Sequence, residues 1–291
     1  MGRAVLVAIN SQKPSAGETA DRLCAVIERH GTLVGRVDVA EGCELDLARK
    51  ADVIAVLGGD GTLLAATRCF FAVEAPLLGI NTGRVGFLAA FDAESLEENA
   101  PALFGDEPLS TRTLRMITAR VRGPRGEEET LHALNELVIT AGPPFRMITL
   151  DISIDGERGP SVSGDGLILS TPTGSTAYNV SAGGPIVAPD VGGLVLTPIA
   201  AHSLSFRPIV LPERARIEVE VGAGNDEDGS GTTLVADGQV HRRVRTGDVI
   251  ELCGGGRAVE FVTDPSVSYW RTLMHKMHWA APPKGREKPG G

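Results

Sequence analysis

Short apolar runs alternate with longer amphipathic stretches in the first third of the chain. The runs at residues 4–10, 52–57 and 76–81 have the length and continuous hydrophobicity of strands buried on both faces. After the first run, apolar residues recur at spacings of three and four from residue 16 to residue 27, which predicts a helix. Strands separated by helices indicate an α/β domain with a parallel, doubly wound sheet over residues 1–106.

The hydrophobic pattern changes to an alternation with period two beyond residue 105. Strand-like segments cover residues 114–121, 131–140 and 149–154, with glycine and proline in the turns between them. A further hairpin is expected over residues 216–236, with an acidic, glycine-rich loop between its strands. We therefore expect a β-rich, sandwich-like second domain over residues 107–265.

The C-terminal part of the chain is expected to return to the first domain. Residues 266–279 are predicted to form a helix that packs there, so that the segment 266–281 joins the first domain. Residues 282–291 (PPKGREKPGG) contain no side chain that needs burial, which predicts a solvated tail.

Composition is that of a globular protein, with 42% hydrophobic and 22% charged residues. Glycine is in excess, at 36 of 291 residues or about 12% against a usual ~7%, which indicates many turns and close backbone approaches. The net charge of −9 argues against a surface built to bind nucleic acid or an anionic membrane.

Several motifs that the sequence lacks indicate where the protein is located and whether its cysteines are free. No run approaches ~18 apolar residues and no signal-peptide pattern opens the chain, so we expect no membrane partner and a cytoplasmic protein. Cys24, Cys43, Cys69 and Cys253 show no metal-ligand spacing. We expect them to be buried free thiols.

A glycine-rich motif, GGDGT at residues 58–62, follows the second strand where a helix begins. Backbone N–H groups of Gly58, Gly59 and Gly61, together with the helix N-terminus and Thr62, are suited to binding phosphate. The motif is neither a dinucleotide fingerprint nor a P-loop. A carboxylate among phosphates suggests that Asp60 accepts a proton or helps to hold Mg²⁺; the alternative is a tight turn with Asp60 as the helix N-cap.

Two further motifs carry polar residues at unusual places. The segment NTGRVGFL at residues 81–88 follows the third strand and brings Arg84 to the same crevice, where it could face phosphate; the alternative is a surface arginine. Asn135 and Glu136 interrupt a strand-like run, where they could bind ribose hydroxyls or a carboxamide. A strand edge or a bulge is the alternative there.

The richest segment is GDGLILSTPTGSTAYNVSAGGPIV at residues 164–187. Its small hydroxyls and glycines surround one aromatic residue, Tyr178, which could flank the flat ring of a polar ligand. The segments at residues 202–208 (HSLSFRP) and 237–239 (DGQ) are weaker, because either could be an ordinary turn.

Together these segments, in this order, resemble the ATP-NAD kinase family over nearly the whole chain. The resemblance implies phosphorylation of NAD at the 2′-hydroxyl of its adenosine ribose, with ATP as donor and Mg²⁺ bound mainly through phosphates rather than by a protein cage. It also implies an active site between an α/β domain and a β-rich domain, completed by a neighbouring subunit of a dimer or tetramer.

Matching motifs assigns roles to single residues. Asp60 would be the general base, and the phosphates would lie at Gly58, Gly59, Gly61, Thr62 and Arg84. The expected NAD ligands are Asp60, Gly61, Asn135, Glu136, Arg146, Asp165, Thr173, Thr176, Ala177, Tyr178, Asn179, Val180, Ser181 and Gln239.

Two other functions remain open on the sequence. A lipid or sphingoid kinase of the GGDGT superfamily would also need the loop aspartate, although no basic amphipathic helix for a membrane surface is evident. A non-catalytic sensor that binds a dinucleotide is the other alternative, and it would gain nothing from Asp60.

Overall fold

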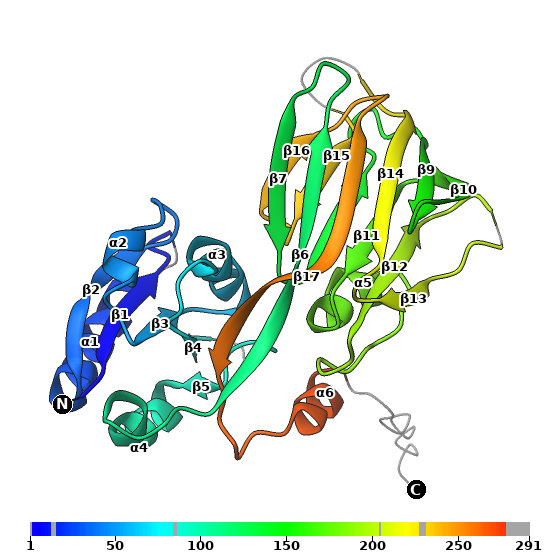
Figure 1. The fold of residues 1–291 in the computed structure, drawn as a ribbon. Coiled ribbons are helices and arrows are strands. Elements are labelled where there is room, and N and C mark those ends of the chain that lie inside the picture. Colours follow the sequence, from blue (N-terminus) through cyan, green and yellow to red (C-terminus); the bar gives the residue numbers. More distant parts are fainter. Residues whose placement is uncertain (1, 13–15, 84–85, 204, 227–230, 278–291) are drawn as a thin grey trace, which may run out of the picture.

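The N-terminal half is a parallel sheet covered by helices on both faces (Figure 1). The computed structural model describes residues 2–12, 16–83, 86–203, 205–226 and 231–277. The strand order is β2-β1-β3-β4, with the short β5 added in parallel to β4. The strands are β1 (Ala4–Ile9), β2 (Thr32–Asp38), β3 (Val53–Leu57), β4 (Leu77–Asn81) and β5 (Phe91–Asp92).

Each face of this sheet has its own hydrophobic core. Val5, Val7 and Ala55 pack with the helices on one face, and Leu6 and Ile54 pack on the other. The first face carries α1 (Ala16–His30) and α4 (Ala93–Phe104), and the second carries α2 (Leu45–Ala48) and α3 (Asp60–Phe70). Burial on both faces explains why β1, β3 and β4 read as continuous apolar runs, and it confirms the predicted doubly wound α/β fold.

The C-terminal half is a β-sandwich, as the alternating pattern predicts. Its six-stranded antiparallel sheet has the order β13-β12-β11-β8-β15-β16. These strands are β8 (Glu136–Thr140), β11 (Gly166–Ser170), β12 (Gly193–Ile199), β13 (Ile209–Pro212), β15 (Thr233–Ala236) and β16 (Val240–Arg243). The facing layer contains β6 (Thr111–Arg122), β7 (Glu128–Ala133), β9 (Ile148–Ile154), β10 (Glu157–Gly164), β14 (Arg216–Ala223) and β17 (Val249–Val262).

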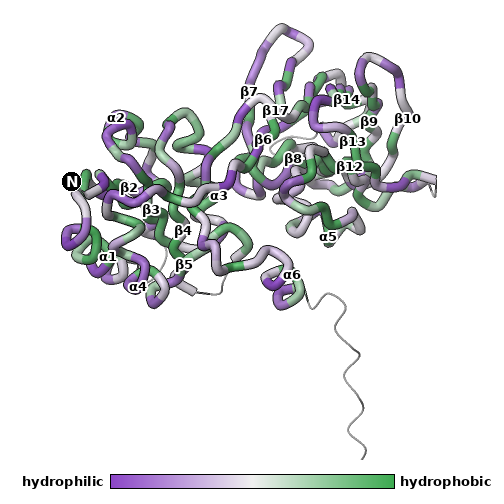
Figure 2. The backbone as a smooth tube through the Cα atoms, turned by 60° about the horizontal axis from the view of Figure 1, so that its bottom comes forward, coloured by the Kyte–Doolittle hydropathy of each residue, from purple (hydrophilic) through white to green (hydrophobic). Residues whose placement is uncertain are grey.

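The two halves share one sheet through two long strands. β6 and β17 pair over almost their whole length, and the far end of β17 pairs with β4 at Phe261 and Leu77. The facing layer of the sandwich is therefore continuous with the N-terminal sheet, as the crossing of β6 and β17 in Figure 1 shows. Figure 2 shows hydrophobic segments concentrated in the strands of both halves, inside the layers that cover them.

The predicted hairpin over residues 216–236 is wrong. β14 pairs with β9 and β17, whereas β15 pairs with β8 and β16 in the other sheet. Val219 on β14 and Leu234 on β15 instead belong to the same core, each on the inner face of its own sheet. The alternation identifies the buried face of a strand but not its neighbour, because both layers of a sandwich bury alternate residues.

The expectation of four buried free thiols is also wrong. Cys43 and Cys69 form a disulfide between the segment before α2 and the end of α3. Cys24 is half-buried and free, and Cys253 is exposed and free. The pairing joins positions 26 residues apart that only the packing of α2 against α3 brings together, so no local motif announces it.

The C-terminal helix forms where the sequence predicts it. α6 (Tyr269–Met277) lies at the junction of the two halves in both views (Figures 1 and 2), with Leu273 buried. The predicted tail at residues 282–291 lies outside the described residues. Among the described helices, none combines the length and apolar character needed to cross a bilayer.

Candidate active site

Asp60 is the first residue of α3 and lies directly beyond the buried strand β3. The N-cap position belongs to Gly59, so the alternative of Asp60 as an N-cap is wrong. Instead, the Asp60 carboxylate accepts backbone hydrogen bonds from Phe87 (2.8 Å) and Leu88 (3.2 Å) in the loop after β4. The carboxylate therefore faces the neighbouring loop at the carboxyl edge of the sheet, where open α/β sheets bind ligands.

The glycines around Asp60 keep this edge open. Gly58 has φ +153°, and a Cβ there would stand 2.4 Å from Oγ1 of Thr62, so both conformation and space require glycine. Gly59 has no neighbouring atom within 4 Å of a Cβ position, and Gly61 is exposed. The expectation that the Gly58 N–H binds phosphate is wrong, because this group donates to the Ile80 carbonyl at 2.9 Å; the Thr62 N–H likewise donates to the Gly59 carbonyl. The N–H groups of Gly59, Asp60 and Gly61, at the start of α3, remain suited to binding an anion.

The loop at residues 81–88 reaches the same point. The Asn81 side chain closes a turn with both the N–H and the carbonyl of Gly83. Arg84 lies outside the described residues, so its predicted phosphate contact remains a prediction. A cation does reach this loop from α6, because Nζ of Lys276 lies 4.7 Å from the centroid of the Phe87 ring. Partial burial lowers the pKa of Lys276, and the nearby Asp60 carboxylate opposes that shift.

Asn135 and Glu136 lie where the chain crosses from one sheet to the other. The predicted strand over 131–140 is broken: β7 ends at Ala133 and β8 begins at Glu136. Glu136 is 6% exposed, and its Oε2 has no hydrogen-bond partner among the described residues. Burial and the charge of Asp237 raise the pKa of Glu136 to about 7, although a hydrogen bond from the backbone of Tyr178 acts to lower it. A buried acceptor without a partner suits a ligand hydroxyl.

Asp237 holds this crossing in place. Asp237 and Gly238, at φ +50° and +66°, and Gln239 form the three-residue turn between β15 and β16, in which the Gln239 N–H donates to the Ala236 carbonyl. The Asp237 carboxylate accepts hydrogen bonds from the N–H groups of Asn135 (2.8 Å) and Leu134 (3.1 Å). It also forms an ion pair of 2.7 Å with Arg68 on α3, a residue that sequence reasoning did not single out. The two side chains are 169 residues apart, and no local pattern links them.

The segment 170–181 packs directly on this crossing. The Thr171 N–H donates to the Asn135 carbonyl (2.9 Å), and a Cβ on Gly174 would stand 2.1 Å from that carbonyl oxygen. The segment continues as a 3₁₀ turn, η1 (Thr173–Thr176), and a short helix, α5 (Tyr178–Ser181). Tyr178 is 44% exposed, which leaves its ring available to a ligand.

Not every predicted ligand on this segment faces outward. Asn179 is fully buried, and its amide nitrogen donates to the carbonyls of Ser175 and Pro185 while its oxygen accepts from Thr197. Its side chain therefore shapes the segment from within. Ser181 is exposed, and the remaining predicted ligands are partly exposed: Thr173, Thr176, Ala177 and Val180.

Gln239 joins the phosphate loop to these residues, because its Nε2 donates to the Gly61 carbonyl at 2.8 Å. The structure thus brings Asp60 and Gly61 together with Asn135, Glu136 and Gln239. Arg146 and Asp165 are exceptions: both are exposed and lie at the other end of β8 and β11, where the Ala141 N–H donates to the Asp165 carbonyl. At about 3.3 Å per residue, these five-residue strands place them roughly 16 Å from the Glu136 end.

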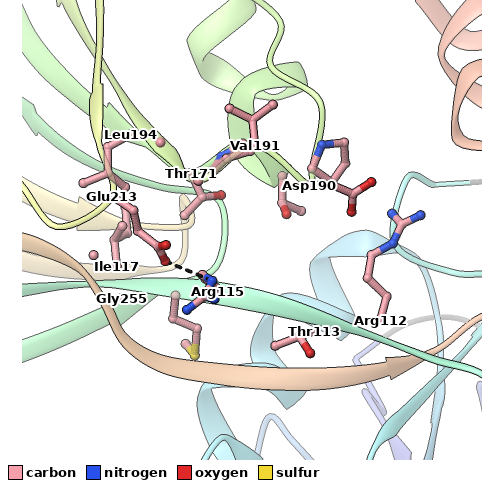
Figure 3. Close-up of a pocket in the computed structure, with 17 residues that line it drawn as sticks. Arg112, Thr113, Arg115, Ile117, Thr171, Asp190, Val191, Leu194, Glu213 and Gly255 are labelled. Carbon is pink, nitrogen blue, oxygen red and sulfur yellow. Dashed lines mark ion pairs between the residues drawn. The ribbon is translucent and has the colours of Figure 1, made fainter.

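Two adjoining cavities lie beside the segment 170–176. One, of about 330 Å³, is bounded by Phe87, Thr176 and Tyr269 of α6. The other, of about 340 Å³, contains the ion pair between Arg115 and Glu213 (3.1 Å; Figure 3). Arg112, Thr173 and Pro189 line both cavities. In the part of the chain that the structure describes, no three His, Cys, Asp or Glu side chains gather to hold a metal ion.

Family models match both halves of the chain. The model described as the ATP-NAD kinase N-terminal domain matches residues 7–107, and the ATP-NAD kinase C-terminal domain matches residues 134–263. The NAD kinase of Azoarcus sp. (strain BH72) is 38% identical over 255 residues, covering 86% of this chain and 83% of that protein. The NAD kinase of Burkholderia thailandensis is 36% identical over 290 residues, covering 95% and 94%.

Solved structures agree with these matches. An NAD kinase from Archaeoglobus fulgidus in complex with ATP superposes with a TM-score of 0.71 at 26% identity, covering 94% of this chain and 98% of that one. Yeast NADH kinase complexed with NADH superposes with a TM-score of 0.81 at 24% identity, covering 98% and 90%, and so has the same fold.

Proposed function

The chain belongs to the ATP-NAD kinase family and is an NAD kinase, and on that premise we propose that Asp60 is the general base of the reaction. In this proposal the γ-phosphoryl group of ATP passes to the 2′-hydroxyl of the adenosine ribose of NAD. The observation that carries it is the position of the Asp60 carboxylate, between the first turn of α3 and the loop at Phe87 and Leu88.

The chemistry requires a base and a phosphate site at one place. A ribose hydroxyl is a poor nucleophile at neutral pH, and proton removal by a positioned carboxylate contributes roughly 10²–10⁴-fold. Each Asp60 oxygen accepts one backbone hydrogen bond and keeps further acceptor capacity for the hydroxyl. The N–H groups of Gly59, Asp60 and Gly61, with the positive end of the helix, bind the donor phosphates. Lys276 adds a positive charge near Asp60, where negative charge accumulates in the reaction.

The NAD side of the site is formed by the sheet crossing and the segment packed on it. The unpartnered Oε2 of Glu136 and the Asn135 side chain bind ribose hydroxyls, and the exposed Tyr178 ring lies flat against a base. The other expected ligands between Thr173 and Ser181, apart from the buried Asn179, complete the contact surface. Gln239 lies between the two substrates, because it already contacts Gly61.

The residues at Asp60 fit a magnesium ion that is bound mainly through substrate phosphates. Mg²⁺ prefers oxygen ligands and is usually held by one or two carboxylates together with phosphates. Asp60 is the carboxylate at the phosphate loop, and its negative charge would favour a cation nearby while the phosphates supply the ligands. When bound, the ion would neutralise negative charge on the phosphates of ATP.

The site is shared between subunits of a homo-oligomer. Asp165 and Arg146 are expected NAD ligands, but both lie at the far end of β8 and β11 from Glu136 and are exposed. That position supports a contribution to the site of a second copy of the chain. Mixing Asp60→Asn with Asp165→Ala subunits tests this, because a mixed oligomer then contains one site with both intact residues. NADP formation well above the sum of the separate variants is expected, and no recovery would place Asp165 outside a shared site.

One assay separates NAD kinase chemistry from the two alternatives. The protein is incubated with ATP, Mg²⁺ and NAD, and NADP is measured alongside phosphorylation of a sphingoid base. NADP without lipid product is the expected result. NAD binding without NADP would indicate a sensor, and lipid product would indicate the other kinase class.

A further inference from the structure

Arg68 lies at the junction between the phosphate loop and the NAD side of the site, although it belongs to none of the motifs. Its guanidinium donates to Oδ2 of Asp237 at 2.7 Å and to Oε1 of Gln239. We propose that Arg68 is a positioning residue that fixes the phosphate loop against Asn135 and Glu136, acting through Asp237 and Gln239. The inference goes beyond the proposed function but rests on its assignment of ATP and NAD to the two sides of the site.

The first connection runs through Asp237 to the NAD side. The Asp237 side chain is fully buried, and its two oxygens accept hydrogen bonds from the N–H groups of Asn135 and Leu134 as well as from Arg68. Burial raises the pKa of Asp237, whereas Arg68 and the two amides oppose that shift. Arg68 thus favours the ionised carboxylate, the form that can accept all three donors. The position of the Asp237 carboxylate therefore fixes the position of the Asn135 backbone.

The second connection runs through Gln239 to the donor side. An arginine side chain only donates hydrogen bonds, so Gln239 must turn its oxygen toward Arg68. This orientation leaves Nε2 to donate to the Gly61 carbonyl at 2.8 Å. Gly61 and Arg68 are seven residues apart on α3 and so lie on the same side of the helix. Arg68 therefore determines which way the Gln239 amide faces the phosphate loop.

Both connections require the shape of arginine. The planar guanidinium presents donors in a fixed fork and reaches two acceptors at once, whereas a lysine ammonium is a compact point charge. Lysine at this position would keep the attraction to Asp237 but lose the contact to Gln239. The two connections can therefore be separated by Arg68→Lys, which keeps one, and Arg68→Gln, which keeps neither.

The test compares these variants in the full-length enzyme by kcat, by KM for NAD and for ATP, and by calorimetric NAD affinity. Arg22→Gln is the matched control, because Arg22 pairs with Glu97 on the exposed surface of the same half. For Arg68→Gln we expect KM for NAD to rise roughly tenfold and kcat to fall roughly 10²-fold. For Arg68→Lys we expect KM for NAD near the wild-type value with a reduced kcat, and for the control no change.

A structural role gives a different pattern. Partial unfolding lowers kcat in proportion to the folded fraction and leaves both KM values and the NAD affinity of the folded enzyme unchanged. That result for Arg68→Gln would overturn the proposal. The proposal would also be overturned if Arg68→Lys had the same kinetic constants as wild type, or the same kinetic constants as Arg68→Gln. The NAD affinities also keep this test separate from the proposed function, since they remain readable if Asp60 proves not to be the base.

Discussion

A Cβ atom on Gly86 would stand 1.6 Å from Oδ1 of Asp60. The loop after β4 therefore touches the Asp60 carboxylate at a point where no side chain fits, and the next two N–H groups of that loop hold the carboxylate. Gly86→Ala should displace Asp60 and lower kcat roughly 10²-fold. Gly83→Ala is the control in the same loop, because a Cβ there meets nothing within 4 Å. Wild-type turnover in Gly86→Ala, measured as NADP formation, would show that this contact does not hold the carboxylate.

Glu136 should make stability depend on pH. Its pKa in the folded protein, about 7, lies above the ordinary value of 4.5, so the folded state binds the proton more tightly than the unfolded state. The free energy of unfolding should therefore fall as pH rises from 4.5 to 7. Glu136→Gln removes this ionisation. The difference in free energy of unfolding between the variant and wild type should therefore shift by about 3 kcal/mol in favour of the variant between pH 4 and pH 8.

Denaturant unfolding of both proteins at the two pH values measures this difference. Glu218→Gln, at an exposed position on β14, is the control and should show no such gain. If the free energies of unfolding of Glu136→Gln and wild type differed by the same amount at both pH values, that result would contradict the raised pKa of Glu136.

Lys276 should support the donor side of the reaction. Removing the charge in Lys276→Met should lower kcat/KM for ATP roughly tenfold, a modest effect because solvent screens a partly exposed cation. KM for NAD should hardly change. Arg271→Met removes an exposed charge from the same helix and serves as the control. Steady-state kinetics with ATP as the varied substrate measures this effect. An equal loss of kcat/KM for ATP in both variants would argue against a specific role for Lys276.

The disulfide between Cys43 and Cys69 should be detectable by counting thiols. The protein unfolded without reductant should expose two thiols, from Cys24 and Cys253, and four after reduction. Closing a loop of 26 residues is worth about 3–4 kcal/mol in the chain-entropy model, so Cys43→Ser should lose about that much stability under oxidising conditions. Cys253→Ser should lose little. Four reactive thiols without reductant would contradict the disulfide.

The sequence predicts those features of the fold that are determined within a single strand, helix or loop. The continuous run before Gly58 identifies a buried strand, and the glycines identify the open loop at Asp60. The alternating segments identify strands of a sandwich. Each of these features depends on residues that are neighbours in the chain.

Features that depend on tertiary pairing could not be predicted. Arg68 and Asp237 meet only because β15 and β16 bring their turn against α3, and the hydrophobic pattern of β14 could not tell which sheet it joins. The break before Glu136 was hidden because Leu131 to Thr140 remains apolar and alternating on both sides of it. The resemblance supplied Asp165 and Arg146, and their distance from Glu136 became visible only in the structure.

The most direct test of the account is Asp60→Asn, with NADP formation and NAD affinity measured on the same preparation. The substitution keeps the size of the side chain but removes its ability to accept a proton at neutral pH. We expect NAD affinity within a few-fold of wild type and turnover lower by roughly 10²–10⁴-fold. Full turnover in this variant would contradict the assignment of Asp60 as the general base.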